Sequence, residues 1–214
     1  MKKEKIQKTN VCRLLDKAKL DYLVHHYPWK EDELDAVHVG HALEKPLGQV
    51  FKTLVLVGDK TGVIVAMLPS EASIDFKALA RASGNKSVEM LHLKDLEKTT
   101  GYIRGGCSPL GMKKNYPLYL ASEAQAWETI IFSAGKRGVQ IELSLQSLVK
   151  IAEAKIVDII KKYGCNLALD LANMNVDDLE TIFINKLDDF APYLALVYIS
   201  DKSKSGVPHQ LPGE

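Results

Sequence analysis

The chain has 214 residues, of which 46% are hydrophobic and 26% are charged, and its formal net charge is +1. This length is enough for one domain of ordinary size plus an appendage, with a hydrophobic core that needs neither disulfides nor metals. The cysteines, Cys12, Cys107 and Cys165, show no CxxC or Cys/His spacing, which argues against a disulfide framework and a zinc site. We therefore expect a protein of the reducing cytoplasm.

Charge and hydropathy along the chain exclude a membrane protein and give a weak signal for nucleic acid. The lysine-rich start, Met1–Lys8, is not followed by an apolar segment, and no run approaches the roughly 20 apolar residues of a membrane span. Asp158–Glu214 holds five lysines against nine acidic residues, a net charge of −4, whereas the preceding part holds 23 basic and 18 acidic residues, a net charge of +5. A mildly basic body suits a polyanion, although most charged residues only solvate a surface.

Helices and short strands are predicted along the first hundred residues. Thr9 and Asn10 can cap the first helix, whose apolar residues recur with helical spacing. The glycines of Gly58–Gly62 suit a tight hairpin, and Gly84 suits a helix end. We expect helices at about 9–18, 34–42, 75–83 and 94–99, and strands at about 22–27, 53–57, 63–68 and 87–90.

The following segment, Tyr116–Leu143, has a β pattern, with strands expected at 118–120, 129–133 and 139–143. Ser144 can cap a closing helix that runs to Ala152. Because the strands occur mostly as hairpins without regular βαβ repetition, the pattern favours an α+β fold with a largely antiparallel sheet.

The acidic extension, residues 158–214, differs from the body, residues 1–157. Its pattern predicts a helix at about 155–163, a second at 175–189 and a strand at 193–199. Residues 200–214, rich in Lys, Ser, Pro and Gly, are expected to be disordered. The extension could cover the body, recruit a partner or have no role.

Three loops combine polar or cationic side chains with backbone that can approach a ligand closely. Val50–Leu54 places Lys52 and Thr53 at the start of an apolar strand. Thr100–Gly111 contains four glycines and one proline, and Ser133–Gly138 holds two cations between glycines. Such amides can bind an oxyanion or a phosphate, although each loop alone is compatible with an ordinary turn.

Taken together in this order, the segments resemble the YbaK/ProX family of tRNA editing domains. The residues that carry the resemblance are Thr9–Leu15, Phe51–Leu54, Thr100–Tyr102, Gly105–Gly106, Ser108–Gly111, Ser133–Gly138 and Ile141–Leu143. The match covers about Thr9–Val157 and is most similar to stand-alone Cys-tRNA(Pro) deacylases. It implies helices around a mixed, barrel-like sheet and a hydrolase that cleaves the ester of a mischarged aminoacyl-tRNA.

The resemblance also implies roles for individual residues. Lys52 matches the family's essential lysine, whose ammonium could bind either the ester carbonyl or the terminal ribose and phosphate and so stabilise charge as the tetrahedral intermediate develops. The substrate-binding candidates are Tyr27, Thr53, Gly105, Gly106, Ser108, Ser133 and Gly135, and the tRNA-contact candidates are Arg104, Lys113, Lys136 and Arg137. No cofactor and no metal are implied, since His25, His26, His38 and His41 lack carboxylate companions with ligand spacing.

No protein nucleophile is implied either, because in cysteine-specific members the substrate's own thiol attacks its ester. Cys12 lies beside an apolar helix face, and neither it nor Cys107 has a histidine nearby in sequence. We therefore interpret both cysteines as small buried hydrophobic residues.

Two departures from the family pattern leave the amino-acid specificity open. Many members have an Asp where Ala121 stands, and some have an acidic residue where Gln140 stands. We expect Cys-tRNA(Pro) or Cys-tRNA(Cys) as substrate, with Ala-tRNA(Pro), another small amino acid, or a non-catalytic tRNA- or synthetase-binding relative as alternatives. Mischarged tRNA is the expected partner, rather than DNA or a membrane, and prolyl-tRNA synthetase is a candidate for supplying tRNA selection.

Overall fold

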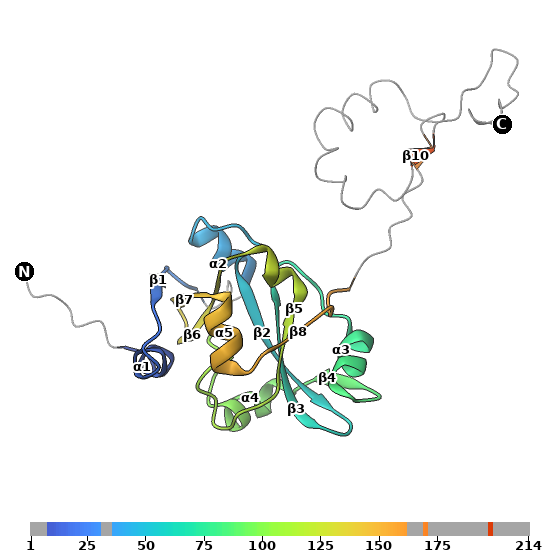
Figure 1. Ribbon diagram of the computed structural model, residues 1–214, viewed down its shortest axis with the longest axis horizontal. Helices are drawn as coiled ribbons and strands as arrows, with labels where there is room; N and C mark the ends of the chain where they lie inside the picture. The colour runs from blue at the N-terminus through green and yellow to red at the C-terminus, as the bar shows by residue number, and fades with distance from the viewer. Residues whose placement is uncertain (1–7, 31–35, 162–168, 171–196, 199–214) are drawn as a thin grey trace, which may run out of the picture. The chain divides into compact units, whose positions relative to one another are not determined.

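The structure, a computed structural model, describes residues 8–30, 36–161, 169–170 and 197–198 (Figure 1). The chain divides into two compact units, residues 1–161 and 162–214. In the second unit, β9 (Leu169–Asp170) pairs in parallel with β10 (Val197–Tyr198), which falls within the predicted strand at 193–199. The predictions for 175–189 and 200–214 lie outside the described residues.

The described residues of the first unit form five α-helices and one 3₁₀ helix, of which the first and the last begin at the predicted caps. They are α1 (Asn10–Lys17), α2 (Ala36–Ala42), α3 (Phe76–Ser83), α4 (Leu93–Thr100), the 3₁₀ helix η1 (Ser122–Ala126) and α5 (Leu145–Ala152). The side chains of Thr9, Asp75 and Ser144 each accept a hydrogen bond from a backbone N–H of the first turn. Gly84 ends α3 with a φ of 75°, in the left-handed region that favours glycine.

The strands of the first unit form two sheets (Figure 1). The smaller sheet is antiparallel, with the order β1 (Tyr22–His26), β7 (Val139–Ser144), β6 (Thr129–Lys136). The larger sheet has the order β4 (Val88–Met90), β2 (Phe51–Gly58), β3 (Gly62–Pro69), β5 (Leu118–Ala121), β8 (Lys155–Val157). β4, β2 and β3 pair antiparallel, whereas β5 and β8 add in parallel, so the sheet is mixed. The expected α+β fold is confirmed.

The two sheets meet where β2 begins. Val50, just before β2, forms a parallel bridge with Ile131 of β6, and the N–H of Ile131 donates to the carbonyl of Gln49 at 2.9 Å. Val50 and Ile131 are also buried against Val39 of α2. This junction brings the first residues of β2 close to β6, although about eighty residues of sequence separate them.

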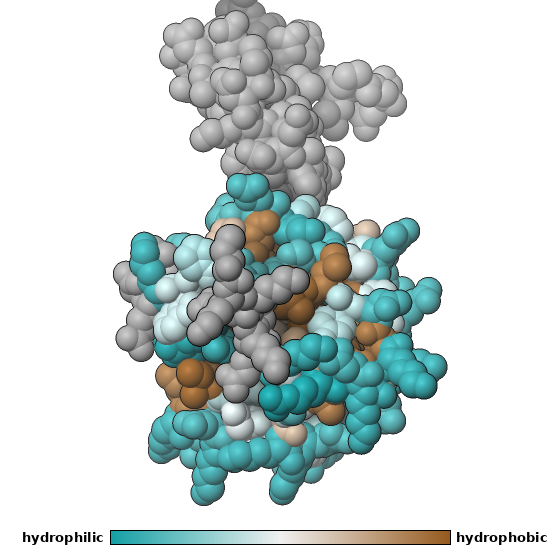
Figure 2. Space-filling view, turned by 90° about the vertical axis from the view of Figure 1, so that its left-hand side faces the viewer, coloured by the Kyte–Doolittle hydropathy of each residue, from teal (hydrophilic) through white to brown (hydrophobic). Residues whose placement is uncertain are grey.

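The main hydrophobic core of the first unit is formed by residues of both sheets and of the helices α1, α3 and α5. Its large side chains that are at most 1% exposed include Leu15, Leu56, Ile64, Met67, Leu68, Leu79, Leu120, Ile130, Phe132, Ile141 and Leu143. On the face shown in Figure 2, apolar side chains form only small patches within a mostly hydrophilic surface. Among the described residues, no helix is long and apolar enough to cross a membrane.

The predicted helix at 155–163 is wrong for the part that the structure describes. Residues 155–157 form β8, which pairs with β5, and Ile160 forms a bridge with Ile74. The apolar residues Ile156, Ile159 and Ile160 fit helical spacing, but β-branched side chains also favour strands. The edge of β5 favours the strand over the helix, because its backbone groups can form hydrogen bonds with a parallel strand.

Candidate active site

A cavity of about 250 Å³ lies at the junction of the two sheets and is reached by all three of the predicted loops. Its lining residues are Ala36, Val39, Val50, Phe51, Lys52, Thr53, Leu54, Ser70, Arg104, Gly105, Cys107, Ser133 and Gln140. The only charged residues in this described lining, Lys52 and Arg104, are cations. Such a cavity suits a small ligand that carries or develops negative charge.

Lys52 is positioned by the end of the neighbouring strand. Its Nζ donates a hydrogen bond of 2.9 Å to the carbonyl oxygen of Ser70, the residue that follows β3. Ser70 is 3% exposed, and its hydroxyl donates to the carbonyl oxygen of Leu47 at 2.9 Å. Its N–H also donates to the carbonyl oxygen of Val50 at 2.7 Å. The hydroxyl and the N–H of Ser70 are therefore both held by hydrogen bonds, and its carbonyl oxygen positions the half-buried ammonium of Lys52 at the cavity wall.

Thr53, next to Lys52, has a buried hydroxyl oxygen without a hydrogen-bond partner, alone among the buried side-chain polar atoms of the described residues. A buried polar group without a partner is costly, so most such groups in native proteins are satisfied. Because Thr53 lines the cavity, a ligand bound there can supply the missing partner.

The second and third loops contact each other beside the cavity. The Nε of Arg137 donates a hydrogen bond of 3.0 Å to the carbonyl oxygen of Arg104. A Cβ atom on Gly106 would lie 3.4 Å from the backbone nitrogen of Arg137, so the two backbones pack closely. Gly135 has a φ of 86°, and a Cβ there would lie only 2.8 Å from the ring of Tyr102. These glycines allow the two loops to meet.

The structure brings together five of the residues predicted for the site and places the others elsewhere. Lys52, Thr53, Arg104, Gly105 and Ser133 line the cavity. The substrate-binding candidates absent from this lining are Tyr27, Gly106, Ser108 and Gly135, and the absent tRNA-contact candidates are Lys113, Lys136 and Arg137.

Two of the residues absent from the cavity lining, Ser108 and Lys113, make structural contacts elsewhere. Ser108 is fully buried, and its hydroxyl accepts a hydrogen bond from the N–H of Leu110. Lys113 packs along Gly101 and donates to the carbonyl oxygen of Lys98 at 3.2 Å. For Ser108 the contact favours a role in shaping the loop over contact with substrate.

Cys107 lines the cavity, which its sequence context did not indicate. Burial raises the pKa of its thiol to about 12, although a hydrogen bond with Thr100 acts in the opposite direction. The thiol is therefore protonated at neutral pH and is a poor nucleophile. Cys12, by contrast, is 3% exposed within the core, as expected.

Two polar residues of the cavity lining, Ser70 and Gln140, are not among the predicted site residues. Ser70 gave no signal, because it acts through its backbone carbonyl. Gln140 is 5% exposed on β7 and lines the cavity, where its Nε2 lies 3.5 Å from the hydroxyl of Tyr27. Ala121 is fully buried in β5 and outside the cavity lining. Of the two departures from the family pattern, Gln140 is thus the one that can contact substrate.

A buried carboxylate holds the small sheet to the segment that precedes β2. Glu142 of β7 accepts a hydrogen bond from the hydroxyl of Thr129 at 2.8 Å and contacts His25 Nε2 at 2.7 Å and Lys45 Nζ at 3.2 Å. Burial alone would raise the pKa of Glu142, but these three hydrogen bonds outweigh it and lower the pKa. This network supports the walls of the cavity without lining it.

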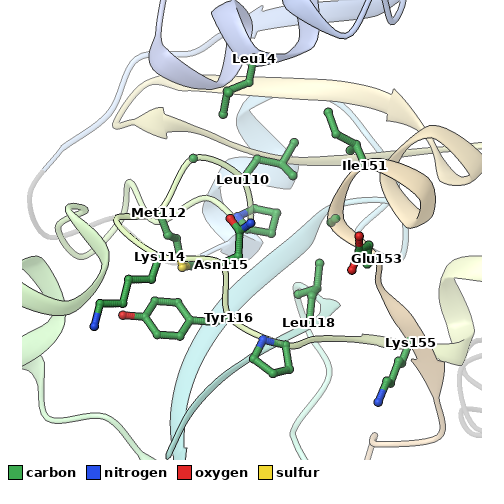
Figure 3. A pocket seen from close by; sticks show the side chains of 14 residues that line it. Leu14, Leu110, Met112, Lys114, Asn115, Tyr116, Leu118, Ile151, Glu153 and Lys155 are labelled. Atoms are coloured by element: carbon green, nitrogen blue, oxygen red, sulfur yellow. The ribbon is translucent and has the colours of Figure 1, made fainter.

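A larger hollow of about 540 Å³ lies elsewhere on the first unit (Figure 3). Apolar side chains of Leu14, Leu110, Leu118 and Ile151 form much of its wall, and Lys114, Glu153 and Lys155 also reach it. It contains none of the residues predicted for catalysis or substrate binding. Among the described residues, no group of three or more His, Cys, Asp or Glu is placed to hold a metal ion.

Comparison with known proteins gives this geometry a family. The family model of the aminoacyl-tRNA editing domain matches residues 31–151, which include every polar residue of the cavity lining. The chain belongs to the aminoacyl-tRNA editing domain family. Editing of an aminoacyl-tRNA is hydrolysis of the ester that joins a wrong amino acid to the tRNA, so the chain is an aminoacyl-tRNA deacylase.

Two relatives and one solved structure extend this assignment. The chain is 53% identical over 161 residues to the "Putative Cys-tRNA(Pro)/Cys-tRNA(Cys) deacylase EbsC" of Enterococcus faecalis, a match that spans 75% of this chain and 98% of that protein. It is 27% identical over 118 residues to the uncharacterized protein YwhH of Bacillus subtilis, covering 55% and 74% of the two chains. A crystal structure titled "a putative trans-editing enzyme for prolyl tRNA synthetase" superposes with a TM-score of 0.62 at 19% identity, covering 73% and 100%, and confirms the fold.

Proposed function

We propose that this editing domain removes cysteine from mischarged tRNA(Pro), with Cys-tRNA(Cys) as a second substrate, and that Lys52 is its catalytic residue. The half-buried ammonium of Lys52 in a cavity of about 250 Å³ is the observation that carries this proposal. A cavity of this size lies below the roughly 300–1,000 Å³ of drug-sized ligand sites, which suits a small amino acid and its ester. The name of the Enterococcus faecalis relative supports cysteine as that amino acid.

Lys52 stabilises the negative charge that develops on the ester carbonyl oxygen in the tetrahedral intermediate. A cation held in place before the reaction costs no reorganisation when the charge appears. The carbonyl of Ser70 fixes the position of Nζ, and the amide of Gly105 lies in the same lining. The unpartnered hydroxyl of Thr53 binds a polar atom of the substrate.

The nucleophile comes from the substrate and not from the protein. The one cysteine in the cavity lining, Cys107, is a neutral thiol, and the described lining contains no histidine. The sulfur of the cysteinyl group adds to its own ester carbonyl, the bond from that carbon to the ribose oxygen breaks, and the ribose oxygen takes the thiol proton. Water then opens the cyclic thioester and releases cysteine.

A panel of charged tRNAs tests the substrate. Purified protein is incubated with Cys-tRNA(Pro), Cys-tRNA(Cys) and Ala-tRNA(Pro), and deacylation is followed with and without prolyl-tRNA synthetase. We expect cysteine to be released more than about a hundred-fold faster than alanine, because an intramolecular thiol has a high effective concentration and alanine has none. Equal rates for alanine and cysteine would contradict attack by the substrate thiol, and tRNA binding without hydrolysis would indicate a non-catalytic relative.

We place this reaction in the cytoplasm, where mischarged tRNA is formed.

A further inference from the structure

A third hollow, of about 470 Å³, has no role in the chemistry proposed for Lys52. Its lining comes from the end of β1 and from the turn between β6 and β7: His26, Tyr27, Pro28, Trp29, Lys136, Arg137, Gly138 and Val139. Two of the tRNA-contact candidates, Lys136 and Arg137, are thus found together with an exposed tryptophan.

Trp29 is 44% exposed, yet two contacts hold its ring in place. The guanidinium of Arg137 lies 5.1 Å from the centroid of the indole, which is within the range of a cation–π interaction. Gly138 also approaches the ring so closely that a Cβ atom there would lie 2.7 Å from Cδ1 of Trp29. An exposed indole with such contacts presents a flat apolar surface in a defined position.

This hollow adjoins the cavity that contains Lys52. The carbonyl oxygen of Arg104 accepts the hydrogen bond from Arg137, and Arg104 also lines the Lys52 cavity. Tyr27 lines the hollow, and its hydroxyl lies 3.5 Å from Gln140 Nε2 in the cavity lining. Residues of the two sites therefore contact each other at two separate points.

An aromatic face beside cations is the arrangement that proteins use for single-stranded nucleic acid, since bases stack on the ring and phosphates contact the cations. The ester of an aminoacyl-tRNA is on the 3′-terminal ribose, and a cavity of about 250 Å³ has no room for the nucleotides that precede it. We infer that Trp29, Lys136 and Arg137 bind the single-stranded 3′ end of the tRNA: a cytosine that precedes the terminal adenosine stacks on Trp29, and phosphates contact Lys136 and Arg137. This inference rests on the proposed function, because the Lys52 cavity must hold the ester.

Binding of uncharged oligonucleotides tests the stacking without any catalysis. The probes are a fluorescein-labelled single strand that ends in CCA and the same strand with abasic residues in place of the two cytosines. We expect Trp29→Ala to weaken binding of the CCA strand by roughly five- to hundred-fold, the range for loss of one stacked base, and to remove its advantage over the abasic strand. Trp29→Phe should retain most of the binding, and Phe76→Ala, which removes an exposed aromatic ring of α3, should retain all of it.

Salt dependence tests the phosphate contacts separately. Each phosphate contact on a single strand contributes about −0.7 to the slope of log K against log salt concentration. Lys136→Ala and Arg137→Gln should each make this slope shallower by about that amount, while Lys98→Ala on α4 should leave it unchanged.

If Trp29→Ala binds the CCA strand and the abasic strand as tightly as the wild type does, the inference is wrong.

Kinetics with two substrates separate this inference from the role of Lys52. Trp29→Ala should lower kcat/KM for Cys-tRNA(Pro) by the same five- to hundred-fold and leave the rate with 3′-cysteinyl adenosine unchanged, because that ester lacks the preceding nucleotides. Lys52→Ala should lower the rates with both substrates. If Trp29→Ala slows both equally, the stacking site is contradicted. If Lys52→Ala slows neither while Trp29→Ala still weakens binding of the CCA strand, the role of Lys52 fails and the nucleic-acid site remains.

Discussion

Lys52 Nζ donates a hydrogen bond of 2.9 Å to the carbonyl oxygen of Ser70, so the end of β3 positions the cation that stands at the start of β2. The antiparallel register explains this contact, since Lys52 is paired with Leu68, two residues before Ser70. The backbone carbonyl of Ser70 is therefore one group that positions the catalytic candidate.

Two threonine-to-valine substitutions should change stability in opposite directions. Thr53→Val removes a buried hydroxyl without a partner, so we expect the free energy of unfolding to rise by about 1 kcal/mol. Thr129→Val removes a hydroxyl that donates to the buried Glu142, so we expect a loss of about 1–3 kcal/mol. Urea denaturation measures both changes.

A deacylation assay should also distinguish Thr53→Val from Thr129→Val. Thr53→Val should lower kcat/KM because its hydroxyl lies in the cavity, whereas Thr129→Val should act mainly on stability. A Thr53→Val variant that is less stable than the wild type and equally active would contradict the role given to this hydroxyl.

Glu142 should make stability depend on pH at the acid end. Because its pKa is lower in the folded protein, the unfolded chain takes up the proton first as the pH falls. The stabilisation is therefore complete above the unfolded pKa of about 4.3 and is lost as the pH falls through the folded value. Glu142→Gln should be less stable than the wild type at pH 7 and should lack this part of the acid-side slope, measured as the free energy of unfolding at several pH values. Parallel pH profiles for the two proteins would contradict the lowered pKa.

Two glycine-to-alanine substitutions test the packing between the loops. Gly62 and Gly135 both have positive φ, at 72° and 86°, but only Gly135 lies against another residue, the ring of Tyr102. Gly62→Ala should cost about 1–2 kcal/mol for the backbone conformation alone, and Gly135→Ala should cost clearly more. Thermal or urea unfolding of both variants gives the difference. Equal losses would show that Tyr102 does not restrict this turn.

Removal of Cys107 tests the absence of a protein nucleophile. With a thiol pKa of about 12, this side chain is neutral during catalysis, so Cys107→Ala should keep kcat for Cys-tRNA(Pro) within about ten-fold of the wild type. Single-turnover deacylation measures the chemical step. A loss of a thousand-fold or more would point to a covalent intermediate on Cys107.

Local signals in the sequence explain why much of the fold could be predicted. The predicted caps Thr9 and Ser144 act on backbone amides within the next turn, and the hairpin at Gly58–Gly62 depends on neighbouring residues. At 155–157 the sequence fits both a helix and a strand, and β5, more than thirty residues earlier, determines the outcome. Long-range pairing of this kind leaves no local pattern to recognise.

In the candidate site, too, the sequence indicates only the residues that carry a local signal. Lys52, Thr53, Gly105 and Ser133 could be named because they stand in recognisable motifs, and they do share one cavity. Ser70 could not be named, because its carbonyl carries no side-chain signature. Residues such as Ser108 stand in the same motifs but shape the loop. A motif thus indicates which segments meet, whereas the packing decides which side chains reach the cavity.

The most direct test of the account is the rate of Cys-tRNA(Pro) deacylation by Lys52→Ala, with Lys98→Ala as the matched control for loss of one positive charge. Loss of one group that stabilises the oxyanion costs about a hundred- to a thousand-fold in kcat, so we expect a decrease of that size for Lys52→Ala, an unchanged rate for Lys98→Ala, and native circular dichroism for both. A folded Lys52→Ala variant that deacylates Cys-tRNA(Pro) at the wild-type rate would contradict the assignment of Lys52 as the catalytic residue.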